Sequence, residues 1–201
     1  MTASNSGLMT YRRNAIIPNL MVKLIMKLNV GGERMIPVPD IIDLGLRVLF
    51  IGFNPSIRSS ETGHHFAGPS NRFWRLLYDS GLTDKKLMPS EDKQLLKYGY
   101  GITNIVPRPT RAAAEITSQE YELGREELKK KLTTYQPRFA CYVGVGVYHQ
   151  FAKRKDTQCG LQKNSVVEGV SDFVLSSSSG LNRIPLEQQL SFYIELKNLL
   201  C

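Results

Sequence analysis

Residues 47–74 read RVLFIGFNPSIRSSETGHHFAGPSNRFW, and this stretch decides the fold. The run Arg47–Ile51 is short and almost wholly apolar, which is typical of a buried strand. Gly52 and an Asn-Pro pair then end the strand abruptly. In an open parallel sheet, ligands bind in the crevice beyond the carboxyl ends of the strands. We therefore expect Asn54 to present an uncharged amide at the place where an active site would form.

The remainder of the chain alternates strand-like and helix-like segments. We predict further strands at 102–106, 139–143 and 172–175, and helices at 71–80, from 90 to the stop at 99, from 117 onward, at 145–152 and at 185–200. Thr117 and Glu120 form a capping box at the start of the longest helix, which must end before Pro137. This alternation predicts an α/β fold, a three-layer α/β/α sandwich with a central, mostly parallel sheet.

Three unusual loops follow strands in this scheme. Residues 54–70 follow the first strand, residues 107–111 follow the second, and residues 176–183 follow the last. Because the carboxyl ends of parallel strands meet at one edge of a sheet, we expect these loops to converge on one cleft.

The last of these loops reads SSSSGLNR at residues 176–183. A serine run is often a flexible surface linker, and this alternative stays open. The loop nevertheless connects a buried strand to a helix, and it carries Leu181 close to Arg183. A leucine at a loop tip beside a basic residue is what a wedge into a stack of nucleic-acid bases requires.

The composition favours a polyanionic partner. The chain has 201 residues, which suits one domain with its own core, and a net charge of +8. Positive charge could also serve solubility alone. The cysteines form no Cys-x-x-Cys pair, and His64 and His65 are adjacent rather than at ligand spacing. We therefore expect reduced thiols in an intracellular protein, and no metal site.

Residues 1–36 differ in composition from the rest. No acidic residue precedes Glu33, whereas four basic residues do: Arg12, Arg13, Lys23 and Lys27. We predict a flexible basic extension at 1–36 that contacts phosphates, followed by one folded domain at 37–201. A mitochondrial presequence and a start at Met35 are alternatives. The apolar run at 20–28 is interrupted by lysine and is too short to span a membrane.

Several short motifs occur in a fixed order along the chain. GFNP stands at 52–55, GHHF at 63–66 and NRFW at 71–74. Each motif is weak alone, but their order and spacing are specific. Together they resemble the first signature of the mismatch-specific uracil- and thymine-DNA glycosylases. The segments TNIVPR at 103–108 and SGLNR at 179–183 resemble two further segments of that family, so the resemblance covers nearly everything beyond the N-terminal extension.

The resemblance implies a uracil-DNA glycosylase-like fold and a monofunctional DNA glycosylase. Such an enzyme flips its target nucleotide out of the duplex and hydrolyses the bond between base and sugar. The substrate would be uracil, or thymine or a modified pyrimidine, in double-stranded DNA with a G·U or G·T mismatch. We expect no cofactor, a monomer and no membrane partner. Strand cleavage is not expected, because these loops carry no lysine placed as a Schiff-base nucleophile.

The resemblance also implies roles for individual residues. Asn54 would orient the attacking water, Phe66 would stack on the flipped base, and Leu181 would fill the vacated space. The other implied site residues are Phe53, Ser59 and His65 in the base pocket, Ser179, Gly180, Asn182 and Arg183 around the wedge, and Arg108 with Arg111 as phosphate contacts. Both Arg108 and Arg111 could equally be ordinary solvated arginines.

Two pocket positions give opposite indications about the base. The resemblance places Ser59 against C5, where thymine-active relatives carry alanine, so a serine hydroxyl would crowd the thymine methyl group. His65 stands where uracil-preferring relatives have proline, which favours thymine. We give Ser59 more weight because its implied contact with the base is direct, and we expect a preference for uracil.

Two departures from the family pattern leave other functions open. Ser56 replaces the usual glycine after Asn-Pro, and a serine would be strained if that position required a positive φ. The Asn-Pro pair that bacterial members place before Ser-Gly is missing. A mismatch-binding protein that has lost catalysis is therefore an alternative, and a small-molecule nucleosidase is a more distant one. The expected location is the cytoplasm with its nucleoid in a bacterium, or the nucleus in a eukaryote.

Overall fold

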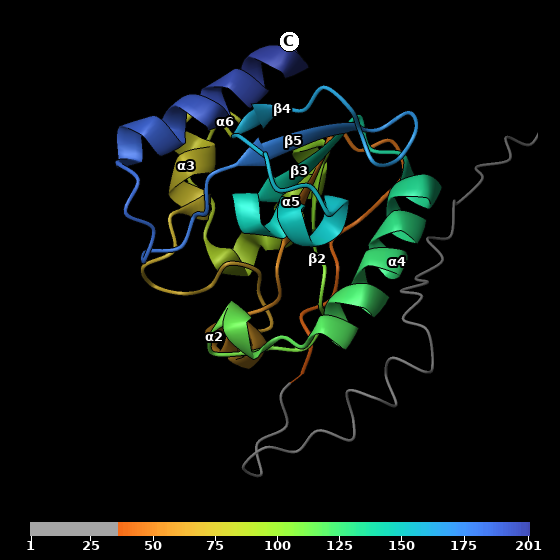
Figure 1. The fold of residues 1–201 in the computed structure, drawn as a ribbon. Helices are drawn as coiled ribbons and strands as arrows, with labels where there is room; N and C mark the ends of the chain where they lie inside the picture. Colours follow the sequence, from red (N-terminus) through yellow and green to blue (C-terminus); the bar gives the residue numbers. More distant parts are fainter. Residues whose placement is uncertain (1–35) are drawn as a thin grey trace, which may run out of the picture.

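A five-stranded sheet forms the centre of the structure (Figure 1). In the computed structural model, which describes residues 36–201, the strand order is β2-β1-β3-β5-β4. The strands are β1 (Val48–Gly52), β2 (Tyr100–Asn104), β3 (Phe139–Val143), β4 (Gly160–Leu161) and β5 (Ser171–Leu175). All neighbouring pairs are parallel except β4 with β5, which is antiparallel. The predicted mostly parallel sheet is confirmed.

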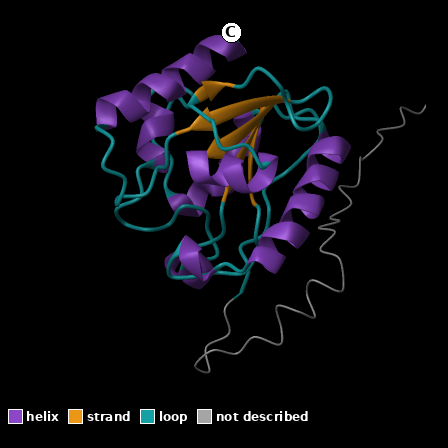
Figure 2. Ribbon diagram, viewed as in Figure 1, coloured by secondary structure: helices purple, strands orange, loops and turns teal. Residues whose placement is uncertain are grey.

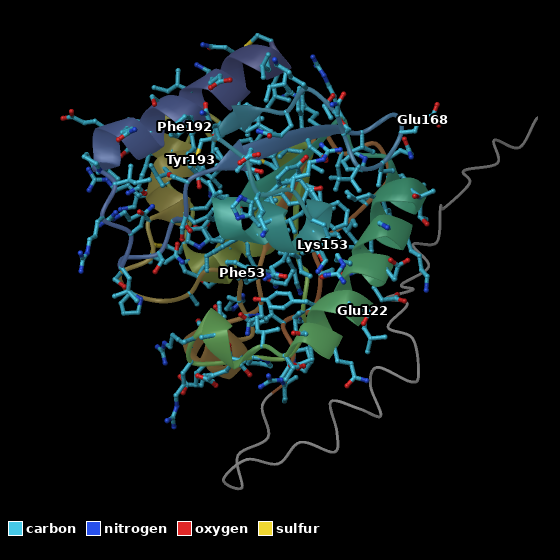
Figure 3. All side chains as sticks on the ribbon, viewed as in Figure 1. Phe53, Glu122, Lys153, Glu168, Phe192 and Tyr193 are labelled. Carbon is cyan, nitrogen blue, oxygen red and sulfur yellow. The ribbon has the colours of Figure 1, made fainter. Side chains whose placement is uncertain are left out.

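Helices cover both faces of the sheet (Figure 2). The α-helices are α2 (Ile57–Thr62), α3 (Phe73–Asp79), α4 (Ser118–Tyr135), α5 (Val145–Ala152) and α6 (Leu186–Leu200), and two 3₁₀ helices are η1 (Pro89–Tyr98) and η2 (Ala113–Glu115). The side chains of β1 alternate between two buried clusters. Phe50 packs with α3 and α6, where Tyr193 faces the sheet (Figure 3), whereas Ile51 packs with α4 and α5. The three-layer sandwich is therefore confirmed.

Local sequence signals predicted most elements closely. The strand at 139–143 and the helix at 145–152 have the predicted bounds, and the capping box of Thr117 and Glu120 begins α4. The segment ending at Gly99 is a 3₁₀ helix, and it begins at Pro89. The predicted strand at 102–106 lies two residues earlier, because its last two apolar residues leave the sheet and are buried in the core cluster beneath α4.

Three elements are absent from the prediction. They are the short strand β4, the 3₁₀ helix η2 and helix α2, the last because residues 54–70 were expected to form an uninterrupted loop. Ser56 is the N-cap of α2, with φ −70° and with its hydroxyl accepting the N–H of Ser59 at 3.1 Å. The condition for strain at Ser56, a positive φ, is therefore not met, because this position has an extended backbone and does not need glycine.

The first described residues lie against helix α2 and strand β2. The predicted extension at 1–36 falls outside the described residues except for Ile36, whose carbonyl accepts a hydrogen bond from Ser60 on α2 at 2.8 Å. Ile41 then forms an antiparallel bridge to Ile102 at the edge of β2. Within residues 36–201, no helix combines the length and the apolar character needed to cross a bilayer.

Helix α4 lies unusually close to the chain that leaves β2. Gly124 is buried in the middle of α4, and a Cβ at this position would overlap the carbonyl oxygen of Ile105. The absence of a side chain at Gly124 therefore sets the distance between α4 and the segment that follows β2. That segment leads directly into the loop 107–111.

We predict that Gly124→Ala lowers the free energy of unfolding by about 1–3 kcal/mol, because the added methyl group has no space. This loss should occur even though alanine favours an isolated helix by about 1 kcal/mol relative to glycine. Denaturant unfolding measures the change. Gly68→Ala is the matched control, since its Cβ would lie 3.9 Å from the nearest neighbour, in Asn71. An unchanged stability for Gly124→Ala would mean that α4 can move outward freely.

Candidate active site

The three loops meet at the carboxyl edge of the sheet, as predicted. They line one cavity of about 220 Å³, which also receives the ends of β1, β2 and β3. The first loop contributes Asn54 and Ser59, and the second contributes Thr110 and Arg111. The loop at 176–183, called the serine loop below, contributes Ser177 and Ser179. The convergence follows from the parallel strand order, and it brings together residues that are far apart in the sequence.

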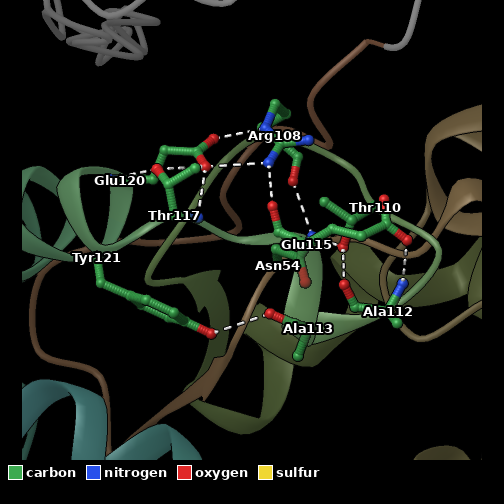
Figure 4. A network of polar contacts seen from close by, with 9 residues as sticks. All are labelled: Asn54, Arg108, Thr110, Ala112, Ala113, Glu115, Thr117, Glu120 and Tyr121. Carbon is green, nitrogen blue, oxygen red and sulfur yellow. Dashed lines mark hydrogen bonds and ion pairs between the residues drawn. The ribbon is translucent and has the colours of Figure 1, made fainter. Parts of the chain in front are cut away.

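The Asn54 side chain has a defined orientation in this cavity (Figure 4). Its Nδ2 donates to the carbonyl oxygen of Arg108 and to the hydroxyl of Thr110, both at 2.8 Å. The Thr110 hydroxyl donates its proton to the carbonyl of Ala112 at 2.8 Å, so toward Asn54 it can only act as an acceptor. Both contacts therefore require the amide nitrogen at this position. The amide oxygen, Oδ1, is left to accept a hydrogen bond from another group.

The Arg108 side chain is partly buried and binds Glu120. Its Nη2 donates to Glu120 Oε2 at 3.0 Å and to the Glu115 carbonyl at 2.9 Å, and its Nε binds Glu120 Oε1. The Arg108 guanidinium is therefore already paired with a carboxylate in the free protein. Arg111 and Arg183 differ from it, since both are exposed and neither forms an ion pair within residues 36–201.

Aromatic rings form part of the cavity wall. Phe66 stacks on Phe73 with ring centroids 4.0 Å apart and an angle of 22° between the rings. Phe66 has a φ of 51°, a left-handed conformation that is uncommon for a bulky residue and that clusters at functional sites. Phe53, labelled in Figure 3, reaches the cavity but packs edge-on against Tyr121 at 6.1 Å. Phe66 is thus the better placed ring for stacking on a planar ligand.

Ser59 and His65 line the cavity as buried polar residues. The Ser59 hydroxyl accepts the N–H of Ala67 at 3.2 Å and contacts the Ser56 hydroxyl at 3.1 Å. His65 Nε2 lies 2.9 Å from the carbonyl of Pro39, which fixes Nε2 as the protonated nitrogen. Burial lowers the pKa of His65 below its usual value, so the ring is neutral at pH 7.

Leu181 is exposed at the tip of the serine loop, as a wedge requires. Its exposed fraction is 92%, the highest of any large apolar residue in the described chain. The loop beneath it is tied down rather than free. The Asn182 side chain donates to the Ser177 carbonyl at 2.6 Å, and the Ser179 hydroxyl accepts the N–H of Leu181 at 3.3 Å. The alternative of a flexible linker is therefore not supported.

Arg72 attaches this loop to the start of α3. Its backbone N–H donates to the Ser178 carbonyl at 2.8 Å, and its Nη1 donates to the Asn182 carbonyl at 3.2 Å. Gly180 lies so close to Ser70 that a Cβ would stand 2.8 Å from the Ser70 carbonyl oxygen. These contacts replace the stiffness that a missing Asn-Pro pair would have supplied. Arg72 lies in the NRFW motif, but no local pattern revealed its contacts with this loop, because its partners are distant along the chain.

Asn104 is a second site residue absent from the sequence-based assignment. It ends β2 and lines the cavity, and its side chain makes no hydrogen bond within residues 36–201. The neighbouring strand makes space for it, since a Cβ on Gly52 would stand 2.6 Å from Asn104 Oδ1. The predicted strand at 102–106 placed Asn104 in the middle of a strand, so the strand-end argument that was applied to Asn54 did not reach it.

Comparison with known proteins identifies the fold and the family. The fold is similar to the solution NMR structure of a uracil DNA glycosylase candidate from Methanosarcina acetivorans, with a TM-score of 0.57 and 20% sequence identity over 82% of this chain and 98% of that chain. At this identity the likeness shows the fold alone. Residues 39–200 match the family model of the uracil DNA glycosylase superfamily. Because this match spans most of the sequence, the chain belongs to the uracil-DNA glycosylase superfamily.

Proposed function

We propose that this protein is a monofunctional DNA glycosylase that excises uracil mispaired with guanine in double-stranded DNA, with thymine and modified pyrimidines as weaker substrates. Members of its superfamily hydrolyse N-glycosidic bonds. The observation that carries the proposal is the orientation of Asn54, whose amide oxygen makes no hydrogen bond within residues 36–201 and can hold a water beside the cavity. We further propose that it acts as a monomer on chromosomal DNA, in the cytoplasm of a bacterium or the nucleus of a eukaryote.

The chemistry relies on positioning rather than on a strong base. Cleavage of the bond between C1′ and N1 produces an oxocarbenium-like sugar and a pyrimidine anion. An amide cannot remove a proton from water as a carboxylate does, but it can place the water under C1′. Stabilisation of the departing anion must then come from hydrogen-bond donors in the cavity. Slow turnover is the expected consequence.

The cavity offers complementary groups for a flipped pyrimidine. Phe66 supplies a ring for stacking on the base. Asn104 carries a donor and an acceptor side by side, which matches the adjacent N3–H and carbonyl of uracil. Cytosine has an acceptor at N3 and a donor at its amino group, which is the reverse of uracil. It would therefore fit only if the Asn104 amide were rotated by about 180°. We therefore assign base recognition to Asn104 and stacking to Phe66.

The surface around the cavity suits a DNA duplex. In the proposed complex, Leu181 enters the base stack while Arg111 and Arg183 neutralise phosphates. Backbone groups of Gly180 and Asn182 face the orphaned guanine. A mispaired base resists flipping least, which is one source of preference for G·U and G·T pairs. A small-molecule nucleosidase would need neither an exposed leucine nor exposed arginines.

The alternative of a mismatch-binding protein without catalysis has lost one of its reasons, because Ser56 is an unstrained helix cap. One assay separates the two functions. The protein is incubated with a G·U duplex, the DNA is heated in alkali, and breakage at the uracil position is measured. A glycosylase leaves an alkali-sensitive site, whereas a binding protein leaves the strand intact.

We predict that Asn54→Ala lowers the rate of base release by about 100-fold or more, because the water loses its acceptor. Duplex affinity should change by no more than a few-fold, since the amide contributes little to binding. A single-turnover assay and a binding titration measure the two quantities. Release at the rate of the unmodified protein would refute the assignment of Asn54.

Leu181→Ala should slow release from paired duplex more than from single-stranded or bulged uracil. Only the paired substrate needs a side chain to hold the base out of the stack. The ratio of the two rates, measured for both proteins, tests this. An equal loss on both substrates would indicate a packing role, which the 92% exposure of Leu181 argues against.

Ser59 should set the preference between uracil and thymine. We expect G·U to be cleaved at least about 10-fold faster than G·T, because a methyl group in a tight pocket changes binding by about 1–3 kcal/mol. Ser59→Ala should narrow the gap. Its hydroxyl also holds Ala67, so unfolding of the variant must be measured alongside. Equal rates on both mismatches in the unmodified protein would show that Ser59 does not control the pocket.

A further inference from the structure

A closed ring of hydrogen bonds stands behind the Asn54 amide (Figure 4). From Asn54 it passes through the Thr110 hydroxyl to the carbonyl of Ala112. The Ala112 N–H donates to Glu115 Oε1 at 3.1 Å, and the Glu115 carbonyl accepts from Arg108 Nη2 at 2.9 Å. The Arg108 carbonyl then accepts from Asn54, which closes the ring. The Asn54 amide is thus held by a loop whose own geometry depends on the Arg108 side chain.

The ring is attached to α4 through one carboxylate. Glu120 binds the Arg108 guanidinium with both oxygens, and its Oε2 also accepts the backbone N–H and the hydroxyl of Thr117, each at 2.9 Å. The pair is largely shielded from solvent, with side-chain exposures of 22% for Arg108 and 16% for Glu120. Two-pronged pairs of this kind fix direction as well as distance. The helix cap and the support of Asn54 therefore share one carboxylate.

We propose that Arg108 and Glu120 are positioning residues for base excision, which hold the Arg108 carbonyl where it fixes the orientation of the Asn54 amide. The proposal rests on the function assigned above to Asn54. Without the pair, the 107–111 loop loses its attachment to α4, and the amide can turn so that Oδ1 no longer faces the water. A small displacement of this kind is costly where catalysis consists of orientation.

The alternative role for Arg108 is a direct contact with a DNA phosphate. To make it, the guanidinium would have to leave a partly buried carboxylate that has no other ion-pair partner within residues 36–201, which leaves Glu120 uncompensated. The hydrogen bond from Arg108 lowers the pKa of Glu120, so the pair remains ionised at neutral pH. Arg111 lines the cavity and carries no such partner within residues 36–201. Phosphate binding therefore falls to Arg111.

Arg108→Gln and Glu120→Gln test the proposal in the full chain. Single-turnover rates at saturating enzyme give the chemical step, and duplex affinity at several salt concentrations gives the number of phosphates neutralised. We expect both variants to lose rate by about 10-fold or more while affinity stays within a few-fold and the salt dependence is unchanged. Arg111→Gln should reduce the salt dependence by about one phosphate.

Glu127→Gln is the matched control. It removes the same charge from the same helix, where Glu127 pairs with Lys130 on the outer surface, and it should change neither rate nor salt dependence. Arg108→Gln could instead keep the rate of base release while the salt dependence of its duplex affinity falls by the equivalent of one phosphate. In that case Arg108 is a DNA contact and the proposal is wrong. Thermal unfolding identifies a variant that does not fold. In that case Arg108→Lys serves, since lysine keeps the charge but cannot make the two-pronged contact.

A double-mutant cycle separates this proposal from the function of Asn54. With Asn54→Ala as the background, Glu120→Gln should cause little further loss, because both changes affect one group. If Asn54→Ala alone keeps full rate, the assigned role of Asn54 fails, and the positioning role fails with it. If Asn54→Ala loses rate but Glu120→Gln does not, only the positioning role fails. Additive losses would place Glu120 in a separate, purely structural role.

Discussion

The orientation of the Asn54 amide is the constraint on which the site depends. An amide carries a donor on its nitrogen and an acceptor on its oxygen. The Arg108 carbonyl and the Thr110 hydroxyl in the 107–111 loop both accept, so they favour the orientation with Nδ2 toward them. Turning the amide would place Oδ1 against the Arg108 carbonyl and would leave polar groups unsatisfied, at a cost of about 1–3 kcal/mol. The position of that loop, and not Asn54 alone, therefore determines which atom faces the cavity.

Different layers of the sandwich support the two halves of the site. The 107–111 loop follows β2 and is fixed by α4, which approaches closely because Gly124 has no side chain. The serine loop follows β5 and is fixed by Arg72 at the start of α3, in the opposite layer. The sheet holds the two layers in register, so its parallel edge is where the Asn54 amide and the exposed Leu181 can face the same ligand.

Sequence patterns predicted those parts of the structure that depend on neighbouring residues. The capping box of Thr117 and Glu120 spans three residues, and it was found with its helix. Helix α2 was missed because its six residues show no apolar period, and a serine cap alone does not distinguish it from a turn. The partners of Arg108 and Arg72 lie 12 and 110 residues away, so no local pattern reveals them. The sequence therefore did not distinguish Arg108, which is paired with Glu120, from Arg111, which is exposed.

The exposure of Leu181 becomes intelligible when it is set beside the cost of base flipping. An apolar side chain that is 92% exposed gains nothing from burial in the free protein. Full burial of a leucine contributes about 1.5–3 kcal/mol, and extrusion of a mispaired base costs a few kcal/mol. In the proposed function, the leucine is buried only when the base has left the stack, so it offsets a large part of that cost. This gain requires the loop to keep its position while the base leaves, which is what the contacts of Arg72 and Gly180 provide.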